Sequence, residues 1–333
     1  MKAIRVAEAG GPEVLRWEEV PTPAPQEGEA LVSIEAAGVN FIDVYFRTGQ
    51  YKSPLPFTVG MEGAGTVAAV GAGVRDFSPG DRVGSVNFAG SYAQFATARA
   101  DRLVKIPDGV STHQAAAALL QGMTAHYLTH ATYRLQAGDF CLVHAGAGGV
   151  GLLLCQISRR MGARVIATAG GPDKERLARE AGAEDTIDYR TKNVAEEVRR
   201  ITGGKGVKVV YDSVGHDTFE GSLDSLSLRG TLALFGQSSG KVAPVDPQIL
   251  NTKGSLFLTR PTLAHYVAAK EELAERSGDV LGWIAAGELS IRIFREIPME
   301  QAEEAHRLLE GRKTTGKVLL VSRAASRNAP PAR

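Results

Sequence analysis

The sequence predicts a two-domain α/β protein, with one β-rich domain and one domain built on a doubly wound parallel sheet. Its 333 residues suffice for two domains of ordinary size. The first third is rich in glycine and in short runs typical of β-strands. From Gly138 onward, strand-like and helix-like segments alternate regularly, which is the pattern of a parallel sheet covered on both faces.

The composition excludes several classes of protein. Lys plus Arg is 38 and Asp plus Glu is 37, so a formal charge of +1 gives no sign of nucleic acid or an acidic membrane as an obligate partner. No run of eighteen apolar residues predicts a membrane span, and the N-terminus lacks the apolar run of a signal peptide. Cys141 and Cys155 are too few for a disulfide framework. We therefore expect a cytoplasmic protein.

Residues 1–122 are expected to form most of the β-rich domain. The runs ALVSIEAAGV, EGAGTVAAVG and DRVGSV cluster small apolar residues between turns such as PTPAPQEG and FSPGDR. From about residue 112 the sequence becomes alanine-rich and typical of a helix, and Ser111 or Thr112 can cap the start of that helix.

Residues 123–262 are expected to form the parallel-sheet domain. Its strands and helices follow one another in the order FCLVHA, GGVGLLLCQISRRMG, RVIATA, DKERLAREAG, EDTIDY, VAEEVRRITG, VKVVYDSVG, TFEGSLDSL, TLALFG and SLFLTR. Residues 263–333 hold two helix-like stretches and the strand-like GKVLLVS, which we expect to return to the first domain and make it discontinuous. The small, basic, proline-bearing tail 323–333 is expected to be disordered.

The strongest motif is HAGAGGVG, in which Gly146, Gly148 and Gly151 satisfy G-x-G-x-x-G. The pattern alone is weak, but here it follows a strand and opens a helix in a βαβ unit. The glycines permit a tight turn, a close approach of backbone to a pyrophosphate and close packing of helix on strand. The helix N-terminus then offers free N–H groups to the phosphates. The sequence therefore predicts a dinucleotide site, with a ligand-free glycine turn as the alternative.

The end of the second strand indicates which dinucleotide binds. An NAD site usually has an acidic residue there, but this strand ends in Thr168-Ala169-Gly170-Gly171. Lys174 follows in the first helical turn, where the helix dipole disfavours a cation unless an anion is bound. A 2′-phosphate satisfies both observations, so NADPH is predicted. Tyr189, after the third strand, can close over the adenosine or serve only in packing.

The residues that could bind zinc are too few and too scattered. A catalytic zinc needs three side-chain ligands and a structural zinc needs four. Cys141 and Cys155 fall in apolar segments and are expected in the core. His126 and His130 have a helical metal spacing, but no H-E-x-x-H accompanies them, and a helix surface is the simpler interpretation.

Taken together, these segments resemble the zinc-independent quinone oxidoreductases, the zeta-crystallin-like branch of the medium-chain dehydrogenase/reductase superfamily. The resemblance spans almost the whole chain and is carried most specifically by GVNFIDVYFRTGQY, HAGAGGVG, VVYDSVG, FGQSSG and LTRP. In zinc-dependent relatives, the counterpart of Asn40 is a cysteine ligand and that of Met61 is a histidine ligand. Only Glu62 remains, and we expect it to hold neighbouring backbone or an arginine.

The resemblance implies a GroES-like catalytic domain and a Rossmann domain, with the active site in the cleft between them and a homodimer paired through SLFLTR. Gln237 departs from the asparagine expected in bacterial relatives, and Arg260 and Arg312 have ordinary surface arginines as the alternative. The residues that match the family's cofactor contacts are Gly148, Gly149, Val150, Gly170, Lys174, Tyr189, Ser213, Phe235, Gln237, Ser238, Arg260 and Arg312.

A quinone acceptor fits a site without a metal. The nicotinamide carries the hydride, and the anion formed on a quinone is a delocalised phenolate that needs no Lewis acid. Asn40, Tyr45 and Tyr51 are expected to line the substrate side, with Thr124 on the nicotinamide side. Asn40 can donate a hydrogen bond to a substrate oxygen or the nicotinamide ribose, and the tyrosines can stack on a flat acceptor and donate a proton. Ordinary packing is the alternative for each.

Two other functions stay open. An enzyme of the same superfamily that reduces the double bond of an enone or alkenal would share every cofactor residue and differ in the shape of its substrate pocket. A non-catalytic NADPH-binding protein of the crystallin or RNA-binding type belongs to another class. The near-neutral charge and the absence of a basic stripe weigh against the RNA-binding form.

Overall fold

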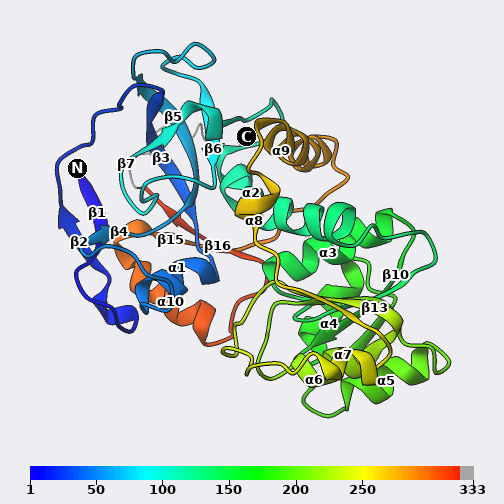
Figure 1. Cartoon of the computed structure of the whole chain (residues 1–333). Coiled ribbons are helices and arrows are strands. Elements are labelled where there is room, and N and C mark those ends of the chain that lie inside the picture. Colours follow the sequence, from blue (N-terminus) through cyan, green and yellow to red (C-terminus); the bar gives the residue numbers. More distant parts are fainter. Residues whose placement is uncertain (323–333) are drawn as a thin grey trace. The chain divides into compact units, whose positions relative to one another are not determined.

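The computed structural model describes residues 1–322, so the disorder expected for residues 323–333 falls outside the described part. The chain divides into two compact units (Figure 1). The first contains residues 1–120 and the described residues from 269 onward, and the second is Gln121–Ala268. None of the described helices combines the length and the apolar character needed to cross a lipid bilayer.

The first unit is built on a sheet of seven strands. Neighbouring strands are antiparallel except β15 and β16, which are parallel, and β7 pairs with β3 beside the main path. The order is β15 (Ile293–Pro298), β16 (Lys317–Val321), β3 (Glu29–Gly38), β5 (Glu62–Val70), β6 (Arg82–Ser85) and β8 (Val104–Lys105), with β7 at Phe95–Arg99. The predicted strand in GKVLLVS corresponds to β16, which pairs with β3 in this sheet.

A smaller antiparallel sheet and several helices complete this unit. The sheet has the order β2 (Arg16–Glu19), β1 (Lys2–Val6) and β4 (Phe57–Thr58). The helical elements are η1 (Pro12–Val14), α1 (Phe41–Arg47), η2 (Ala100–Arg102), α9 (Lys270–Ala285), η4 (Met299–Gln301) and α10 (Ala302–Glu310). The two predicted helices of the C-terminal part correspond to α9 and α10, whereas strand β15 between them was not anticipated.

Helix α2 (Thr112–Tyr127) runs across the boundary between the two units. Its cap is Ser111, whose Oγ accepts a hydrogen bond from the Gln114 N–H at 3.1 Å, while Gln114 Oε1 accepts one from the Ser111 N–H at 3.0 Å. This reciprocal pair is a capping box. The Thr112 hydroxyl instead donates to Glu35 Oε2 at 2.7 Å, so of the two predicted caps only Ser111 serves.

The second unit is built on a parallel sheet of six strands. Their order is β11 (Asp185–Asp188), β10 (Arg164–Ala169), β9 (Phe140–Val143), β12 (Val207–Asp212), β13 (Leu226–Leu234) and β14 (Phe257–Thr259). This is the order 3-2-1-4-5-6 of the Rossmann fold, with its switch point between β9 and β12. All six strands were predicted from the sequence, although β13 begins five residues before TLALFG.

Helices cover both faces of the parallel sheet. The chain moves outward from β9 in one direction and from β12 in the other, so right-handed crossovers place the helices of the two halves on opposite faces. Accordingly α3 packs beside α4, and α5 beside α6 (Figure 1). The helical elements of this unit are η3 (Leu128–Thr132), α3 (Gly149–Arg160), α4 (Pro172–Glu180), α5 (Val194–Ile201), α6 (Phe219–Ser225), α7 (Gln248–Thr252) and α8 (Leu263–Tyr266).

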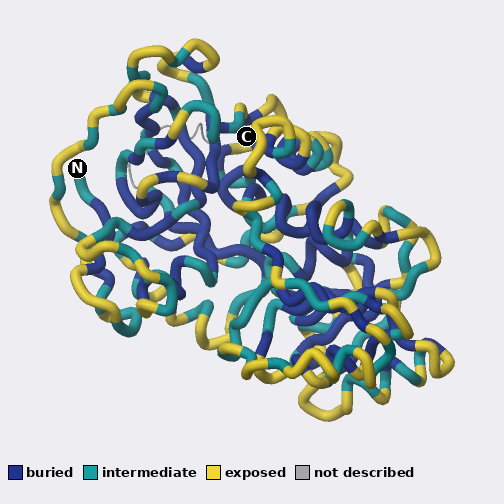
Figure 2. Tube along the Cα trace, in the orientation of Figure 1, coloured by how far each residue is buried: buried dark blue, intermediate teal, exposed yellow. Residues whose placement is uncertain are grey.

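Each unit has its own apolar core, and the strands run through these cores while the loops are exposed (Figure 2). In the first unit, β3 contributes more core side chains than any other element, and β1, β7, β16 and α10 also contribute. In the second unit, Leu142, Ile166 and Val210 are buried at the centre of β9, β10 and β12. Burying a side chain of this size contributes roughly 1.5–3 kcal/mol. The carboxyl ends of these strands are consequently held rigidly, which fixes the loops that follow them.

Candidate functional site

The glycine motif forms a tight turn between β9 and α3. Gly146 donates its N–H to the Thr168 carbonyl at 2.8 Å, and Gly148 donates to the Ala145 carbonyl at 2.8 Å before acting as N-cap of α3. A methyl group on Gly146 would lie 2.7 Å from the Ala167 side chain, and one on Gly151 would overlap the Ala145 carbonyl oxygen. The required strand–turn–helix context is therefore present, and the turn fits the backbone approach that a pyrophosphate needs.

A buried polar network supports this turn through Thr168, which accepts a hydrogen bond from the turn residue Ala145. The Ser222 hydroxyl donates to Asp212 Oδ2 at 2.8 Å and accepts from His144 Nε2 at 3.0 Å, which leaves His144 Nδ1 to accept from the Thr168 hydroxyl at 3.1 Å. Thr168 Oγ1 in turn accepts the Ala145 N–H at 3.2 Å. Burial lowers the pKa of His144, in agreement with a neutral ring. No motif in the sequence indicates that these residues act together.

Asp212 also shapes the loop that carries Ser213. Its Oδ1 accepts the N–H groups of Val214 at 2.8 Å and Gly215 at 3.1 Å, so the chain turns sharply at the carboxyl end of β12. Ser213 O then accepts the Ser238 N–H at 3.2 Å. The structure thus brings Ser213 together with the loop after β13, which contains the other predicted residues Phe235, Gln237 and Ser238.

The loop after β10 meets two side chains from the end of β11. A methyl group on Gly170 would lie 2.7 Å from the Tyr189 hydroxyl, and one on Gly171 would overlap the Arg190 guanidinium. Lys174 follows in the first turn of α4. Tyr189 is 44% exposed, so its ring is not a core packing residue. Tyr189 therefore lies beside Gly170 and Arg190 beside Gly171, and Lys174 follows them in the first turn of α4.

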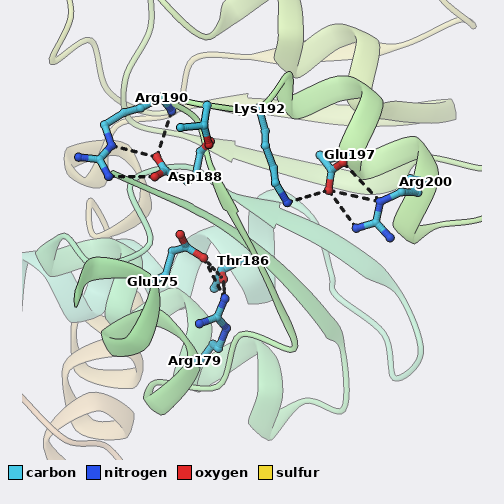
Figure 3. A network of polar contacts seen from close by, with 9 residues as sticks. Glu175, Arg179, Thr186, Asp188, Arg190, Lys192, Glu197 and Arg200 are labelled. Carbon is cyan, nitrogen blue, oxygen red and sulfur yellow. Dashed lines mark hydrogen bonds and ion pairs between the residues drawn. The ribbon is translucent and has the colours of Figure 1, made fainter. Parts of the chain in front are cut away.

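Arg190 is fixed by Asp188, as Figure 3 shows. Its Nε and Nη2 donate to the two carboxylate oxygens at 3.0 and 2.9 Å, and this pair lowers the pKa of Asp188 to about 2. The neighbouring ion pairs in the figure join exposed or half-exposed side chains and contribute little to stability, namely Glu175–Arg179, Lys192–Glu197 and Glu197–Arg200. A basic residue directly after Tyr189 was the sequence signal that could have identified Arg190.

In the first unit, Lys317 of β16 and Glu62 of β5 meet Asn40, the N-cap of α1, in the interior. Lys317 Nζ donates to Glu62 Oε2 at 2.5 Å and to Asn40 Oδ1 at 2.7 Å, while Asn40 Nδ2 donates to Glu62 Oε2 at 2.8 Å. Glu62 Oε1 accepts the backbone N–H of Leu120 at 2.7 Å. The expectation that Glu62 holds backbone is correct, but its cation is a lysine and not an arginine. A lysine within the apolar run KVLLV was the overlooked signal.

The Asn40 carboxamide is fully oriented by these partners. An ammonium only donates, so it faces the amide oxygen, and a carboxylate only accepts, so it faces the amide nitrogen. The second amide hydrogen goes to the Gly38 carbonyl at 3.1 Å. Asn40 is 5% exposed, and both its hydrogens are used within the chain. The expected hydrogen bond from Asn40 to a substrate oxygen is therefore incompatible with this arrangement.

A second buried chain of polar groups extends from helix α1. The Arg47 guanidinium donates from Nη1 to His306 Nδ1 at 3.0 Å and binds both carboxylate oxygens of Glu310 at 2.9 and 2.8 Å. His306 Nε2 lies 3.3 Å from the Tyr92 hydroxyl, which donates to Asp43 Oδ2 at 3.1 Å. Burial raises the pKa of Asp43 to about 7 and lowers that of His306 to about 3, helped by the charge of Arg47.

The predicted tyrosines belong to an aromatic cluster on and after α1. Tyr45 and Tyr51 have ring centroids 5.3 Å apart in an edge-to-face arrangement, and Phe41 and Phe46 pack on either side at 6.2 and 5.7 Å. Tyr45 is buried and Tyr51 half-buried. An edge-to-face pair leaves ring faces that a flat aromatic molecule can meet. Packing and substrate contact are both compatible with these positions.

The remaining predicted residues lie on helices α2 and α3, after strand β14 and after helix α10. Thr124 lies within α2 and is buried. Gly149 and Val150 begin α3. Arg260 is exposed after β14, and its only described hydrogen bond goes to the Pro261 carbonyl. Arg312 is exposed just after α10.

The histidine pair at metal spacing is not on a helix surface as expected. His126 is buried, 2% exposed, and its ring stacks on that of His130 with centroids 4.2 Å apart. The reason is that α2 has small apolar residues around its circumference and is enclosed by neighbouring elements. Among residues 1–322, no three or more His, Cys, Asp or Glu side chains are grouped so that they could hold a metal ion.

Comparisons with known proteins agree with this geometry. Residues 26–108 match the alcohol dehydrogenase GroES-like domain, and residues 149–275 match the zinc-binding dehydrogenase domain. The quinone oxidoreductase of Pseudomonas aeruginosa is 44% identical over 322 residues, covering 96% of this chain and 99% of that protein. The crystal structure of Escherichia coli quinone oxidoreductase complexed with NADPH superposes with a TM-score of 0.95 at 43% identity, covering 96% and 100%.

A further relative is the 2-haloacrylate reductase of a Burkholderia species, 41% identical over 324 residues, 95% of this chain and 97% of that protein. The two matched domains define a member of the medium-chain dehydrogenase/reductase superfamily. Within that superfamily, the chain belongs to the quinone oxidoreductase family. The predicted fold, a GroES-like domain with a Rossmann domain, is confirmed.

Proposed function

We propose that this protein is an NADPH-dependent enzyme that reduces quinones by hydride transfer. Support comes from the glycine turn after β9, and from Lys174 and Arg190 near the loop Gly170–Gly171. The relative that was crystallised with NADPH supports it as well. The observation that most supports a quinone as acceptor is the cluster of Asn40, Glu62 and Lys317, whose side chains hydrogen-bond to one another. Its charges and hydrogen bonds are satisfied by the chain itself, so it suits an acceptor that needs no Lewis acid.

In this proposal the bound NADPH supplies a hydride, and one proton from the medium completes reduction of a quinone to a hydroquinone, leaving NADP⁺. The backbone N–H groups of Gly149 and Val150, in the first turn of α3, would hold the pyrophosphate, because the Gly148 N–H is donated to the Ala145 carbonyl. Lys174, Tyr189 and Arg190 would hold the adenosine 2′-phosphate. Tyr45 and Tyr51 present ring faces or hydroxyl groups to the acceptor. Asn40 does not donate the proton, because both its amide hydrogens are already used.

The second candidate is reduction of an activated carbon–carbon double bond, which the 2-haloacrylate reductase relative favours. The third, a non-catalytic NADPH-binding protein, shares every cofactor residue. A panel of acceptors separates them: a naphthoquinone, a small alkenal and 2-chloroacrylate, each with NADPH and with NADH. We expect the quinone with NADPH to have the highest kcat/KM. Faster turnover of an alkene would support the second candidate, and tight NADPH binding without turnover would support the third.

The zinc independence has its own measurement. Incubation with a chelator such as EDTA should leave quinone reduction unchanged, because no residue grouping described above offers three metal ligands. A zinc-dependent alcohol dehydrogenase treated in parallel serves as the positive control. Loss of activity that returns on adding zinc would refute the metal-free mechanism.

Lys174→Ala is expected to raise the KM for NADPH by roughly 10-fold or more and the KM for NADH by less than about 2-fold. The reason is that a charge-assisted contact to a phosphate contributes roughly 1.5–3 kcal/mol, and NADH lacks that phosphate. Arg190→Ala should shift the same ratio, since its guanidinium lies beside Gly171. Arg200→Ala, an exposed residue of the same unit, is the matched control. Equal changes for both cofactors would mean that Lys174 does not contact the phosphate.

We also propose a homodimer paired through β14, the outermost strand of the parallel sheet. Support comes from two large apolar side chains near that edge, since Phe257 is 61% and Leu228 75% exposed. Phe257→Glu is expected to convert a dimer to a monomer in light scattering coupled to size exclusion. Leu55→Glu, at an apolar residue 49% exposed in the other unit, should leave the dimer intact. A wild-type monomer at micromolar concentration would contradict the proposal.

The cytoplasm is the compartment that we propose. Support comes from Cys141 and Cys155, which are both buried and form no disulfide. Fractionation of cells that express the protein, with a periplasmic marker as control, measures this directly.

A further inference from the structure

Lys317 is a charged residue at the start of an otherwise apolar strand. It begins strand β16, followed by Val318, Leu319 and Leu320, and its side chain is 1% exposed. The side chain has room because Gly38 lies beside it, where an added methyl group would come within 2.7 Å of Lys317 Cε. A lysine is almost never buried to this extent without a partner. Its ammonium must therefore be compensated by the groups that it meets.

Those groups are Glu62 and Asn40, and both depend on the ammonium. Glu62 is 0% exposed and carries a charge that is costly to bury alone. Its oxygens are occupied by three donors, the Leu120 N–H, Asn40 Nδ2 and Lys317 Nζ. Without the lysine, the carboxylate would lose its cation, and the Asn40 oxygen would lose its donor, so that only the acceptors Glu62 and Gly38 would orient the amide.

We propose that Lys317 is a positioning residue of the active site, which acts by fixing the orientation of the Asn40 carboxamide. With Lys317 in place, the amide oxygen accepts from the ammonium, while the amide hydrogens go to Glu62 Oε2 and to the Gly38 carbonyl. Lys317 therefore determines the hydrogen-bonding character of the surface that Asn40 contributes. The consequence for turnover rests on the proposed function and on the expectation from the sequence that Asn40, held in this cluster, borders the substrate side.

A double-mutant cycle tests whether Lys317 acts through Asn40. Lys317→Met is expected to lower kcat for the quinone by roughly 10-fold or more in the wild-type background, an effect typical of misplacing a group near the reaction. In the Asn40→Ala background, the same substitution should lower kcat by less than about 2-fold, because nothing remains for Lys317 to orient. The same loss in both backgrounds would overturn the proposal. Lys105→Met, at an exposed lysine of the same unit, is the control.

A second comparison separates positioning from stability. Lys317→Met alone leaves a buried carboxylate unpaired and should lower Tm by roughly 10 °C. Glu62→Gln combined with Lys317→Met removes both charges and should restore much of the Tm. We expect kcat to stay low in this double variant, because Asn40 is no longer fixed. Recovery of kcat together with Tm would show that Lys317 only stabilises the fold.

A readout without turnover keeps this test independent of the proposed function. The side-chain amide protons of Asn40 are hydrogen-bonded and should exchange slowly in the wild type. In Lys317→Met they should exchange at least about 10-fold faster, as measured by ¹⁵N-resolved NMR at a temperature where the variant is folded. Unchanged exchange would overturn the proposal. If exchange changes as expected and the wild type reduces no quinone, the proposed function fails while the positioning role stands.

Discussion

Gly151→Ala is expected to weaken NADPH binding by about 100-fold, the largest single effect that we anticipate on the cofactor. A methyl group there would overlap the Ala145 carbonyl oxygen and approach Gly146 Cα to 2.9 Å. Both contacts are with backbone, so no side chain can rotate away, and overpacking of this kind costs roughly 1–3 kcal/mol. Relief requires the turn to move away from the position in which, under the proposed function, its N–H groups would bind a pyrophosphate.

The matched control is Gly221→Ala in helix α6 of the same unit. Nothing lies within 4 Å of the methyl group it would add, and alanine favours a helix by about 1 kcal/mol over glycine. NADPH binding should be unchanged and Tm equal or slightly higher. Titration of NADPH fluorescence at 20 °C, below the Tm of each variant, gives Kd directly. A Gly151→Ala protein that binds NADPH as tightly as the wild type would show that the turn is not the pyrophosphate site.

The glycine turn was predictable because all its determinants are local. Gly146, Gly148 and Gly151 lie within six residues, between a strand and a helix whose patterns are clear from the sequence. The same applies to the parallel sheet, most of whose strands are short apolar runs separated by helices. Strand β15 was missed because its residues are mostly half-buried or exposed, so IFREIP shows no apolar face that would predict a strand.

The polar clusters could not be predicted because their members are remote in the sequence. Lys317 is 255 residues from Glu62, and His306 is 214 residues from Tyr92. Only the antiparallel pairing of β16 with β3, and of β3 with β5, brings the first pair together. A resemblance to a family can indicate that Asn40 lies near a site. The direction of its hydrogen bonds, however, depends on which side chains the folded sheet places around it.

Asp43 and His306 are expected to give the stability of this protein two opposing dependences on pH. Burial raises the pKa of Asp43 from 3.8 to about 7, against the lowering effects of the Asn40 N–H, Lys317 and Tyr92 and with a smaller rise from Glu62. Burial and the charge of Arg47 lower the pKa of His306 from 6.5 to about 3. Asp43 Oδ1 has no hydrogen-bond partner within residues 1–322, which agrees with a carboxyl that is costly to ionise.

The sign of each pH dependence follows from whether the folded or the unfolded state binds more protons at that group. Between about pH 4 and pH 7 the folded state retains the Asp43 proton and the unfolded state does not, so this group makes stability fall as pH rises. Between about pH 3 and pH 6.5 the unfolded state protonates His306 and the folded state does not, so this group makes stability rise with pH. Across the shared window, from about pH 4 to 6.5, the two effects largely cancel in the wild type.

Removing either group should therefore reveal the pH dependence of stability that the other group contributes. Relative to wild type, Asp43→Asn should make the free energy of unfolding rise with pH between about 4 and 6.5, and His306→Gln should make it fall, each by up to about 1.4 kcal/mol per pH unit. Urea titrations at intervals of half a pH unit measure both slopes, and lost hydrogen bonds add only an offset that does not vary with pH. Slopes of the same sign in the two variants would mean that these residues do not oppose each other, and that other groups set the pH dependence.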